Sequence, residues 1–204
     1  WVLAQERECR TAGQRGYCSP DAYDGEPGIL YHNNGDGTFA DVSEKSGIGR
    51  HIGKGMGVAF ADYDGDGFTD IFVSNDTVRN FLFHNRGDGS FEDVSLPSRV
   101  AVESGPALGV IPADFDRDGD PDLYVANDQK PNFYWVNQGD GTFRNEALLA
   151  GVAVNAAGNP EASMGVDAGD FDADGDLDLF KTNLRGETNT LYVNDGHGMF
   201  TDRT

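Results

Sequence analysis

The stretch that decides the fold is Asp62-Tyr63-Asp64-Gly65-Asp66-Gly67-Phe68-Thr69-Asp70. The same pattern of acids returns as Asp114-Phe115-Asp116-Arg117-Asp118-Gly119-Asp120-Pro121-Asp122 and as Asp170-Phe171-Asp172-Ala173-Asp174-Gly175-Asp176-Leu177-Asp178, at steps of 52 and 56 residues. A second motif, with Gly-Asp-Gly or Gly-His-Gly at its centre, begins at Asn33, Asn85, Asn137 and Asn194, at steps of 52, 52 and 57 residues. Two motifs that keep one long period indicate an internal structural repeat.

Each period contains four short runs that are typical of β-strands. In the first, residues 57–60 lead into the aspartate stretch and residues 71–73 leave it, while residues 81–83 and 91–94 flank the Gly-Asp-Gly turn. Glycine and Asp between aromatic flanks are typical of a β-hairpin. Four antiparallel strands in about 50 residues, repeated, predict an all-β chain of β-propeller blades, because a β-sandwich does not repeat its turns at a fixed long period. Residues 147–153 are the one short candidate for a helix.

These elements predict about three and a half blades. We expect a non-repeat segment over 1–28, a leading hairpin over 29–43, and blades over 53–95, 105–147 and 161–204. Propellers close with about 4–8 blades. The repeats are therefore expected to form part of a larger ring of about seven blades, completed by further blades or another subunit. The alternative is a compact four-bladed ring that takes its missing strands from residues 1–26.

The three aspartate stretches have the donor pattern of calcium loops, with carboxylates at positions 1, 3, 5 and 9 and Gly at position 6. Calcium takes 6–8 oxygen ligands, and Gly at position 6 permits the sharp bend while the main-chain carbonyl at position 7 adds an oxygen. We expect three calcium ions. The expected side-chain ligands are Asp62, Asp64, Asp66 and Asp70, then Asp114, Asp116, Asp118 and Asp122, then Asp170, Asp172, Asp174 and Asp178. The expected main-chain ligands at position 7 belong to Phe68, Asp120 and Asp176.

Three other interpretations of these stretches fit the sequence less well. An EF-hand needs a Glu at position 12, where the chain has Val73, Val125 and Lys181. Magnesium prefers to keep its waters over binding in an all-protein cage. Turns held only by Asp side-chain hydrogen bonds would leave like charges packed together without a cation.

The composition of the chain excludes several function classes. Its 35 acids against 15 bases give a net charge of −20, which disfavours nucleic acid and anionic membrane surfaces as partners. The longest apolar run, residues 147–154, is too short to cross a bilayer.

The aspartate stretch, preceded by Met56-Gly57, Leu108-Gly109 or Met164-Gly165, resembles the FG-GAP and VCBS repeats. The hairpin motifs over 30–39 and 191–200 resemble bacterial FG-GAP proteins of the ASPIC/UnbV type. The chain departs from the family at the Met-Gly and Leu-Gly pairs, where Met or Leu replaces the Phe of the name motif. The resemblance covers about residues 28–204. It implies calcium-bearing blades like those of integrin-α propellers, used mainly for binding, and an extracellular, cell-surface or periplasmic location.

Cys9 and Cys18 are the only cysteines, and their spacing fits neither a Cys-x-x-Cys redox motif nor a zinc ribbon. In an extracellular protein we expect them to form a local disulfide, with free thiols as the alternative.

Two functions follow from these observations. The first is a non-catalytic scaffold for binding, adhesion or assembly, whose partner is a protein, a further set of blades or a second subunit. The alternative is a carbohydrate-binding module, or the propeller of a polysaccharide-active enzyme, for which Trp135, Tyr134 and Asn137 could form a platform unless they belong to the core. No hydrolase elbow, metalloprotease motif or phosphate loop occurs, so we expect no enzyme.

We expect His32 and His84 to face solvent, and Lys181 and Arg185 to lie on a solvated edge.

Overall fold

The computed structural model describes residues 9–11, 13–16, 18 and 20–204 and contains three consecutive groups of four antiparallel strands. The first two groups are joined into one eight-stranded sheet by pairing at Ser104 with Arg79 and Pro106 with Asp76, and the third group is a separate four-stranded sheet. Within each group the strands pair in chain order, as in a propeller blade. Blade 1 contains β7 (Gly55–Ala61), β8 (Asp70–Arg79), β9 (Phe81–Asn85) and β10 (Phe91–Asp93). Blade 2 contains β11 (Ser104–Ala113), β12 (Asp122–Asn127), β13 (Phe133–Asn137) and β14 (Phe143–Asn145). Blade 3 contains β15 (Val166–Gly169), β16 (Asp178–Lys181), β17 (Thr190–Asn194) and β18 (Phe200–Asp202).

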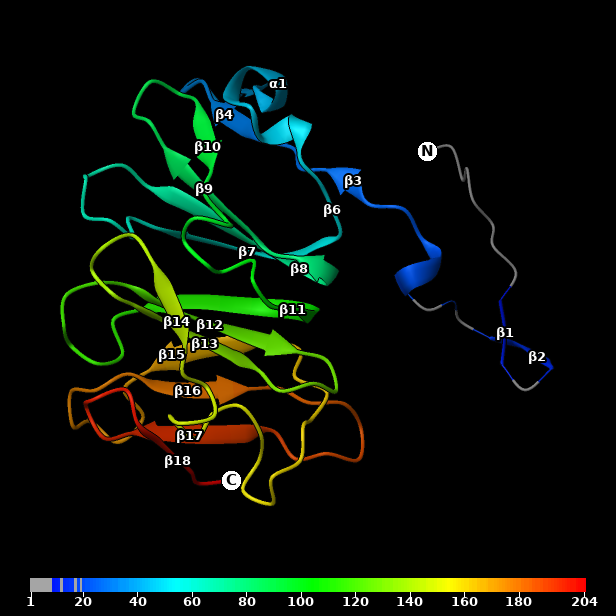
Figure 1. Cartoon of the computed structure of the whole chain (residues 1–204), viewed down its shortest axis with the longest axis vertical. Helices are drawn as coiled ribbons and strands as arrows, with labels where there is room; N and C mark the ends of the chain where they lie inside the picture. The colour runs from blue at the N-terminus through cyan, green and yellow to red at the C-terminus, as the bar shows by residue number, and fades with distance from the viewer. Residues whose placement is uncertain (1–8, 12, 17, 19) are drawn as a thin grey trace.

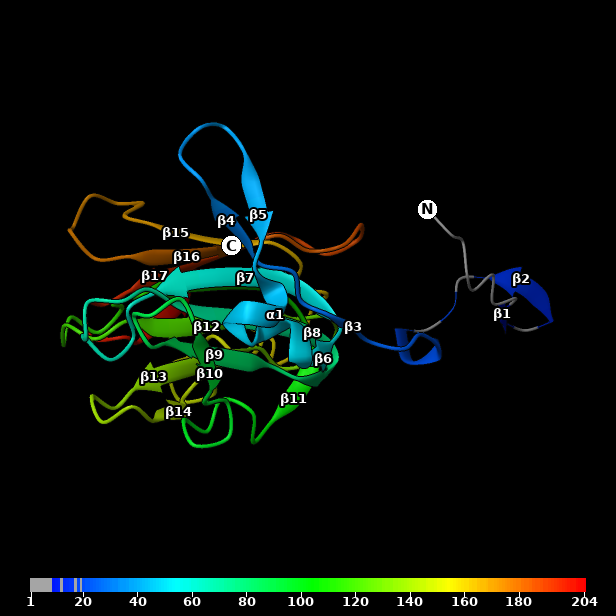
Figure 2. The ribbon, with the colours of Figure 1, turned by 90° about the horizontal axis from the view of Figure 1, so that it is seen from above.

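The chain before blade 1 forms short pieces of structure. A separate hairpin joins β4 (Tyr31–Asn33) and β5 (Phe39–Asp41), and β3 (Glu26–Pro27) pairs with β6 (Ile52–Gly53). The strands β1 (Cys9–Thr11) and β2 (Gln14–Gly16) pair with each other, and a disulfide joins Cys9 to Cys18, as expected. Figures 1 and 2 both place β1 and β2 apart from the blades, which does not fit the compact ring that would use residues 1–26 as blade strands.

Helix is scarce in the described residues. The only α-helix there is α1 (Ser43–Ser46), beside the 3-10 turns η1 (Pro20–Ala22) and η2 (Ile48–Arg50). The candidate helix at residues 147–153 forms hydrogen-bonded turns instead, in which the Val152 amide donates to the Ala147 carbonyl. None of the helices described is long and apolar enough to cross a membrane.

The blades are stacked, with blade 2 between blades 1 and 3 (Figure 1). Their first strands approach so closely that glycine is required at two positions. A Cβ on Gly57 would lie 2.7 Å from the Leu108 carbonyl oxygen, and one on Gly109 would lie 2.6 Å from the Met164 carbonyl oxygen. Such separations are too short for any side chain, so the Met-Gly and Leu-Gly pairs of the repeat mark the contact between blades.

Two apolar clusters fill the spaces between the blades. The first joins Phe72 and Leu82 of blade 1 to Trp135 and Phe143 of blade 2, and the second joins blade 2 to blade 3. Trp135 and Tyr134 are each 1% exposed, which makes them core residues and removes the expected platform of the carbohydrate alternative.

The aromatic residue at position 2 of the first two aspartate stretches reaches the next blade. Tyr63 packs on Phe143 with ring centroids 5.8 Å apart, and Phe115 packs on Phe200 at the same distance. Phe171, at the same position of blade 3, is 69% exposed, whereas Phe115 is 1% exposed. The structure is therefore an all-β partial propeller. Closure into a larger ring stays a prediction.

Candidate metal centres

The three aspartate loops connect the first strand of each blade to its second strand. Figure 1 shows these connections, β7 to β8, β11 to β12 and β15 to β16, at the same edge of the stack. The three connections occupy equivalent positions of the repeat, each between the first and second strand of its blade. We call them loop 1 (62–70), loop 2 (114–122) and loop 3 (170–178).

Hydrogen bonds to the first Asp fold each loop into a tight curve. In loop 1 the amides of Asp66 and Gly67 donate to the Asp62 carboxylate over 3.1 and 2.8 Å, and in loop 3 the equivalent amides donate to Asp170. Gly at position 6 is in the left-handed region in every loop, with φ of 89°, 100° and 92°. The sharp bend that Gly was expected to permit at position 6 is therefore confirmed.

Position 4 is also in the left-handed region, which the sequence did not indicate. Gly65 adopts it without cost, whereas Arg117 and Ala173, both with φ 63°, are strained. An L-residue in this conformation costs about 1–2 kcal/mol. Loops 2 and 3 therefore hold a conformation that the backbone does not favour by itself.

The Asp at position 9 begins the second strand of each blade and is buried. Both oxygens of Asp122 accept hydrogen bonds, from the Asn137 amide at 2.8 Å and from the Tyr134 hydroxyl at 2.8 Å. Burial raises the pKa of Asp122 to about 7, and burial also raises the pKa of Asp70. These carboxylates anchor the loop to the hairpin of the same blade, a role that the ligand pattern did not predict.

The loops bring together carboxylate oxygens in three groups whose ligand atoms lie within 4.8 Å of one another. The groups are Asp62 with Asp64 and Asp70, Asp114 with Asp116 and Asp118, and Asp170 with Asp172 and Asp178. Like charges at this separation repel, and one oxygen of Asp114 is buried and accepts no hydrogen bond in the described part of the chain. Hard oxygen donors with unused lone pairs fit a calcium ion.

The side chains at position 7 turn away from these groups toward the hairpin turn of the same blade. A Cβ on Gly139 would lie 3.0 Å from an Asp120 oxygen, one on Gly196 would lie 2.5 Å from an Asp176 oxygen, and one on Gly87 would meet the Phe68 ring. Asp176 also pairs with Arg117 of loop 2. This arrangement leaves only the main-chain carbonyl of position 7 for a metal.

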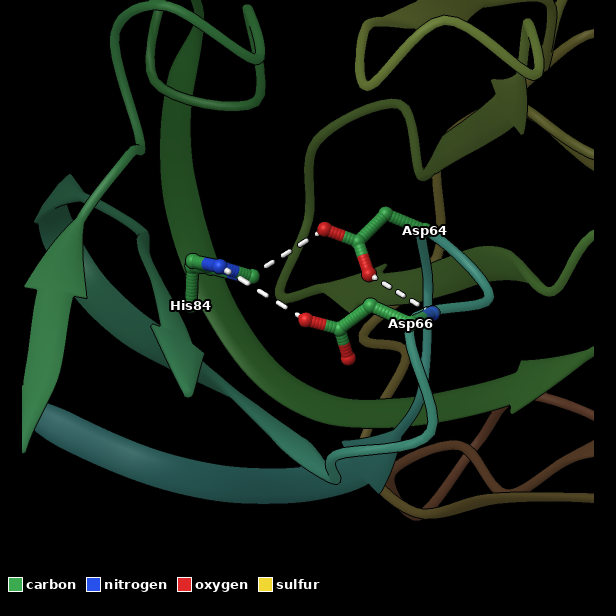
Figure 3. A group of neighbouring side chains, drawn as sticks. All are labelled: Asp64, Asp66 and His84. Atoms are coloured by element: carbon green, nitrogen blue, oxygen red, sulfur yellow. Dashed lines mark hydrogen bonds and ion pairs between the residues drawn. The ribbon is translucent and has the colours of Figure 1, made fainter. Parts of the chain in front are cut away.

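The side chain of His84 is 23% exposed, and its ring faces the acids of loop 1 instead of pointing freely into solvent as expected. Figure 3 shows its ring turned toward Asp64 and Asp66, and its Nδ1 lies 3.2 Å from Asp64 Oδ2. The signal was present in the sequence, because His84 precedes the hairpin Asn in the only blade that has both an aspartate loop and a histidine at this position. His32 is exposed, as expected.

Lys181 does not lie on a solvated edge either. It is 1% exposed, and its Nζ lies 2.6 Å from Oε2 of Glu161, which also accepts from Thr190 and Asn183. A buried Lys is stable only when it is paired in this way. Arg185 is exposed.

The hairpin Asn is a functional position that the sequence analysis passed over. Nδ2 of Asn137 donates to the main-chain oxygen of Tyr63 in loop 1, and Nδ2 of Asn194 donates to that of Phe115 in loop 2, both over 2.8 Å. The hairpins of blades 2 and 3 thus each hold the loop of the preceding blade. The recurrence of Asn at the start of all four hairpin motifs was the available signal.

Stacked four-stranded blades, each with an aspartate loop between its first and second strands, define a repeat protein of the β-propeller class. The sequence model of the FG-GAP-like repeat matches residues 22–73, 62–125 and 114–181. The chain belongs to the FG-GAP-like repeat family. The ASPIC/UnbV comparison stays a resemblance.

The similar proteins agree with this assignment. The chain is 32% identical to cartilage acidic protein 1 of Homo sapiens over 165 residues, covering 81% of this chain and 23% of that protein. It is 31% identical to the Mus musculus protein over 165 residues, covering 81% of this chain and 24% of that protein. The chain thus spans about a quarter of the length of the curated relatives it matches.

A solved structure is also similar. It is an Agrocybe aegerita lectin that recognises non-reducing terminal N-acetylglucosamine, with 22% identity and a TM-score of 0.47, covering 87% of this chain and 45% of that chain.

Proposed function

We propose that the chain is a calcium-stabilised, non-catalytic binding scaffold outside the cell. The observation that carries this proposal is the position of the loops. Each joins two strands of one blade, is anchored to the hairpin of that blade by its buried position 9, and in loops 1 and 2 is held by the Asn of the next blade. A cation in such a loop stiffens the contact between blades.

Calcium is the ion that we propose for each loop. The side-chain ligands are the acids at positions 1, 3, 5 and 9, and the main-chain ligands are the carbonyls of Phe68, Asp120 and Asp176. Affinity should lie nearer the roughly 10⁻⁴–10⁻³ M of extracellular modules than the roughly 10⁻⁷–10⁻⁵ M of sensor sites. Extracellular calcium concentrations suit such an affinity.

Two features support a non-catalytic role outside the cell. The close carboxylate groups found in the described residues all lie in the loops, where a cation would occupy the oxygens that acid–base chemistry needs. The Cys9–Cys18 disulfide is typical of oxidising compartments.

The partner that we propose is a protein surface, with further blades as the best-supported case. Gly165 and the exposed Phe171 lie on the outer face of blade 3. They occupy the same positions as the residues that pack blade 1 on blade 2 and blade 2 on blade 3. The exposed aromatic residue and the glycine fit a blade of the same kind. Glycan binding is the competing outcome, and a glycan array with the calcium-loaded protein would reveal it.

The test of calcium stabilisation is melting with calcium and with a chelator. At a free concentration one hundred times Kd, each site stabilises the folded state by about 2.7 kcal/mol. For a chain of 204 residues this raises Tm by at least about 5 °C per site. Magnesium at the same concentration is the control and should restore little of the loss. An identical Tm with calcium and with chelator would refute the proposal.

A further inference from the structure

The two ends of the stack present the two halves of a contact that the chain makes twice within itself. At each inner contact, the aromatic residue at position 2 of an aspartate loop packs on the Phe of the next hairpin, and the Asn of that hairpin donates to the main chain of the loop. We propose that the hairpin of β4 and β5 in one copy of the chain binds loop 3 of a second copy. The inference rests on the proposed function in that it takes blades as the partners of blades.

The hairpin of β4 and β5 has the geometry of the hairpins that hold loops. Its cross-strand pairs, Tyr31 with Asp41 and Asn33 with Phe39, match the pairs of the hairpins in blades 2 and 3. One side of the hairpin already packs on the apolar face of blade 1 through Leu30. The hairpin therefore lies against blade 1 as the outer strands of a preceding blade would.

The other side of this hairpin is uncovered. Tyr31 is 57% exposed and Phe39 is 63% exposed, whereas the equivalent Trp135 and Phe143 of blade 2 are each 1% exposed. Figure 2 shows β4 and β5 projecting from the stack of blades. Exposed aromatic side chains that lie together are typical of a surface that binds another protein.

Asn33 is arranged like the two Asn residues that hold loops. Its Oδ1 accepts from the Gly35 amide at 2.9 Å, as Oδ1 of Asn137 accepts from the Gly139 amide at 3.1 Å. In Asn137 and Asn194 this arrangement leaves Nδ2 to donate to the loop of the preceding blade. Nδ2 of Asn33 has no acceptor among the described residues, so it is available to a loop of the same kind.

Loop 3 offers the complementary half at the opposite end of the stack (Figure 1). Phe171 is 69% exposed, whereas the equivalent Phe115 is 1% exposed and packs on Phe200. The main-chain oxygen of Phe115 accepts from Asn194, but that of Phe171 accepts no hydrogen bond in the described part of the chain. The hairpin and loop 3 thus each lack what the other supplies.

The number of blades favours a second copy as the occupant. Each copy contributes three blades and the outer hairpin of a fourth, so two copies joined head to tail at both ends supply about seven blades, within the roughly 4–8 of closed propellers. Contacts between unlike patches can close into a ring of this kind. The charge of −20 on each chain opposes association, so added salt and calcium in the loops should both favour it.

Sedimentation of the full chain over a series of concentrations, in calcium and moderate salt, tests the contact. Wild type should form a dimer. Phe171→Ser and Phe39→Ser should each weaken the dimer at least about tenfold, because each removes an aromatic side chain from the contact. Both side chains are exposed in the single chain, so both variants should fold. Leu148→Ser is the matched control, because Leu148 is 80% exposed on the middle blade, and it should leave the dimer unchanged.

A mixture of the two variants distinguishes a head-to-tail contact from other kinds of association. Each variant alone lacks one half of the contact, but together the Phe171 of one meets the Phe39 of the other. The mixture should therefore dimerise more readily than either variant alone. Asn33→Asp keeps the Oδ1 acceptor for the Gly35 amide and removes the Nδ2 donor, so it should weaken the dimer about fivefold.

Three results would overturn the inference: a wild type that stays monomeric at every concentration, unchanged dimerisation of either aromatic variant, or a mixture that associates no better than its components. Melting of the same samples with calcium and with chelator separates the two proposals. A monomer whose Tm rises with calcium would remove only the contact between copies. A dimer whose Tm ignores calcium would remove the proposed calcium stabilisation and leave the contact standing.

Discussion

At the scale of single residues, aspartates that look alike in the sequence have different tasks. Asp118, at position 5, lies in the carboxylate group of loop 2, whereas the Asp120 side chain points at Gly139 in the hairpin turn. Asp122 is buried and anchors the loop to the hairpin. Alternation within the loop predicted the difference between positions 5 and 7. The anchoring task was not predictable, because it depends on a hairpin amide 15 residues away.

We expect Asp118→Ala to weaken calcium binding at loop 2 far more than Asp120→Ala. Removal of one side-chain ligand should cost about tenfold or more in Kd, equivalent to about 1.4 kcal/mol or more, whereas Asp120 can still ligate through its main chain. Calorimetric titration of both variants measures this. Equal losses would mean that position 7 contributes its carboxylate.

Lys181 shows the limit of sequence reasoning at this scale. A Lys at position 12, where the other loops have Val73 and Val125, gave no sign of burial. Its partner Glu161 lies 20 residues earlier, at a position where the other two blades have Gly53 and Gly105. Only the tertiary structure brings the two charges together.

At the scale of elements, the repeat period predicted the order of strands in each blade, because the hairpin and loop signals are local. The contact between blades was harder to predict from the sequence. The Gly of each Met-Gly or Leu-Gly pair stands out in the sequence, but its task is steric and becomes clear only when the first strands lie side by side. The close approach of Gly109 to the Met164 carbonyl oxygen shows it.

We expect Gly109→Ala to destabilise the protein and Gly165→Ala to have a small effect. The new methyl group at position 109 would lie 2.6 Å from the Met164 carbonyl oxygen, which forces the first strands of blades 2 and 3 apart. Overpacking of this kind costs about 1–3 kcal/mol. At position 165 the nearest atom is Oγ1 of Thr182 at 3.3 Å, a side chain that can move. Urea unfolding of both variants measures the difference, and equal midpoints would contradict the proposed contact.

At the scale of the whole molecule, the blades form the stable body and the disulfide hairpin stands apart. The Cys9–Cys18 bond joins residues separated by 9 positions, in a segment that Figures 1 and 2 place away from the blades. The constraint therefore acts on a local piece of chain. Composition and cysteine spacing predicted the bond, but not its isolation.

We expect the double variant Cys9→Ser, Cys18→Ser to leave the melting of the blades almost unchanged. The shift in Tm should stay below about 2 °C, which for a protein of this size corresponds to less than about 1 kcal/mol. Differential scanning calorimetry in calcium measures it. A larger decrease would show that the hairpin packs on the blades in solution.

The Asn side chains that cross between blades have a consequence for how the array fills with metal. Asn137 donates a hydrogen bond to loop 1, and Asn194 donates one to loop 2. An ion that orders one loop would therefore also order the hairpin of the same blade, and this hairpin supports the loop of the preceding blade. We therefore expect the three proposed sites to fill as a short linear lattice with nearest-neighbour coupling instead of three independent equilibria. Loop 2 has a neighbour on each side, so it should gain from both couplings and bind its ion most tightly. Cooperativity of this kind needs no second conformation, because each bound ion would reduce the flexibility of the neighbouring loop.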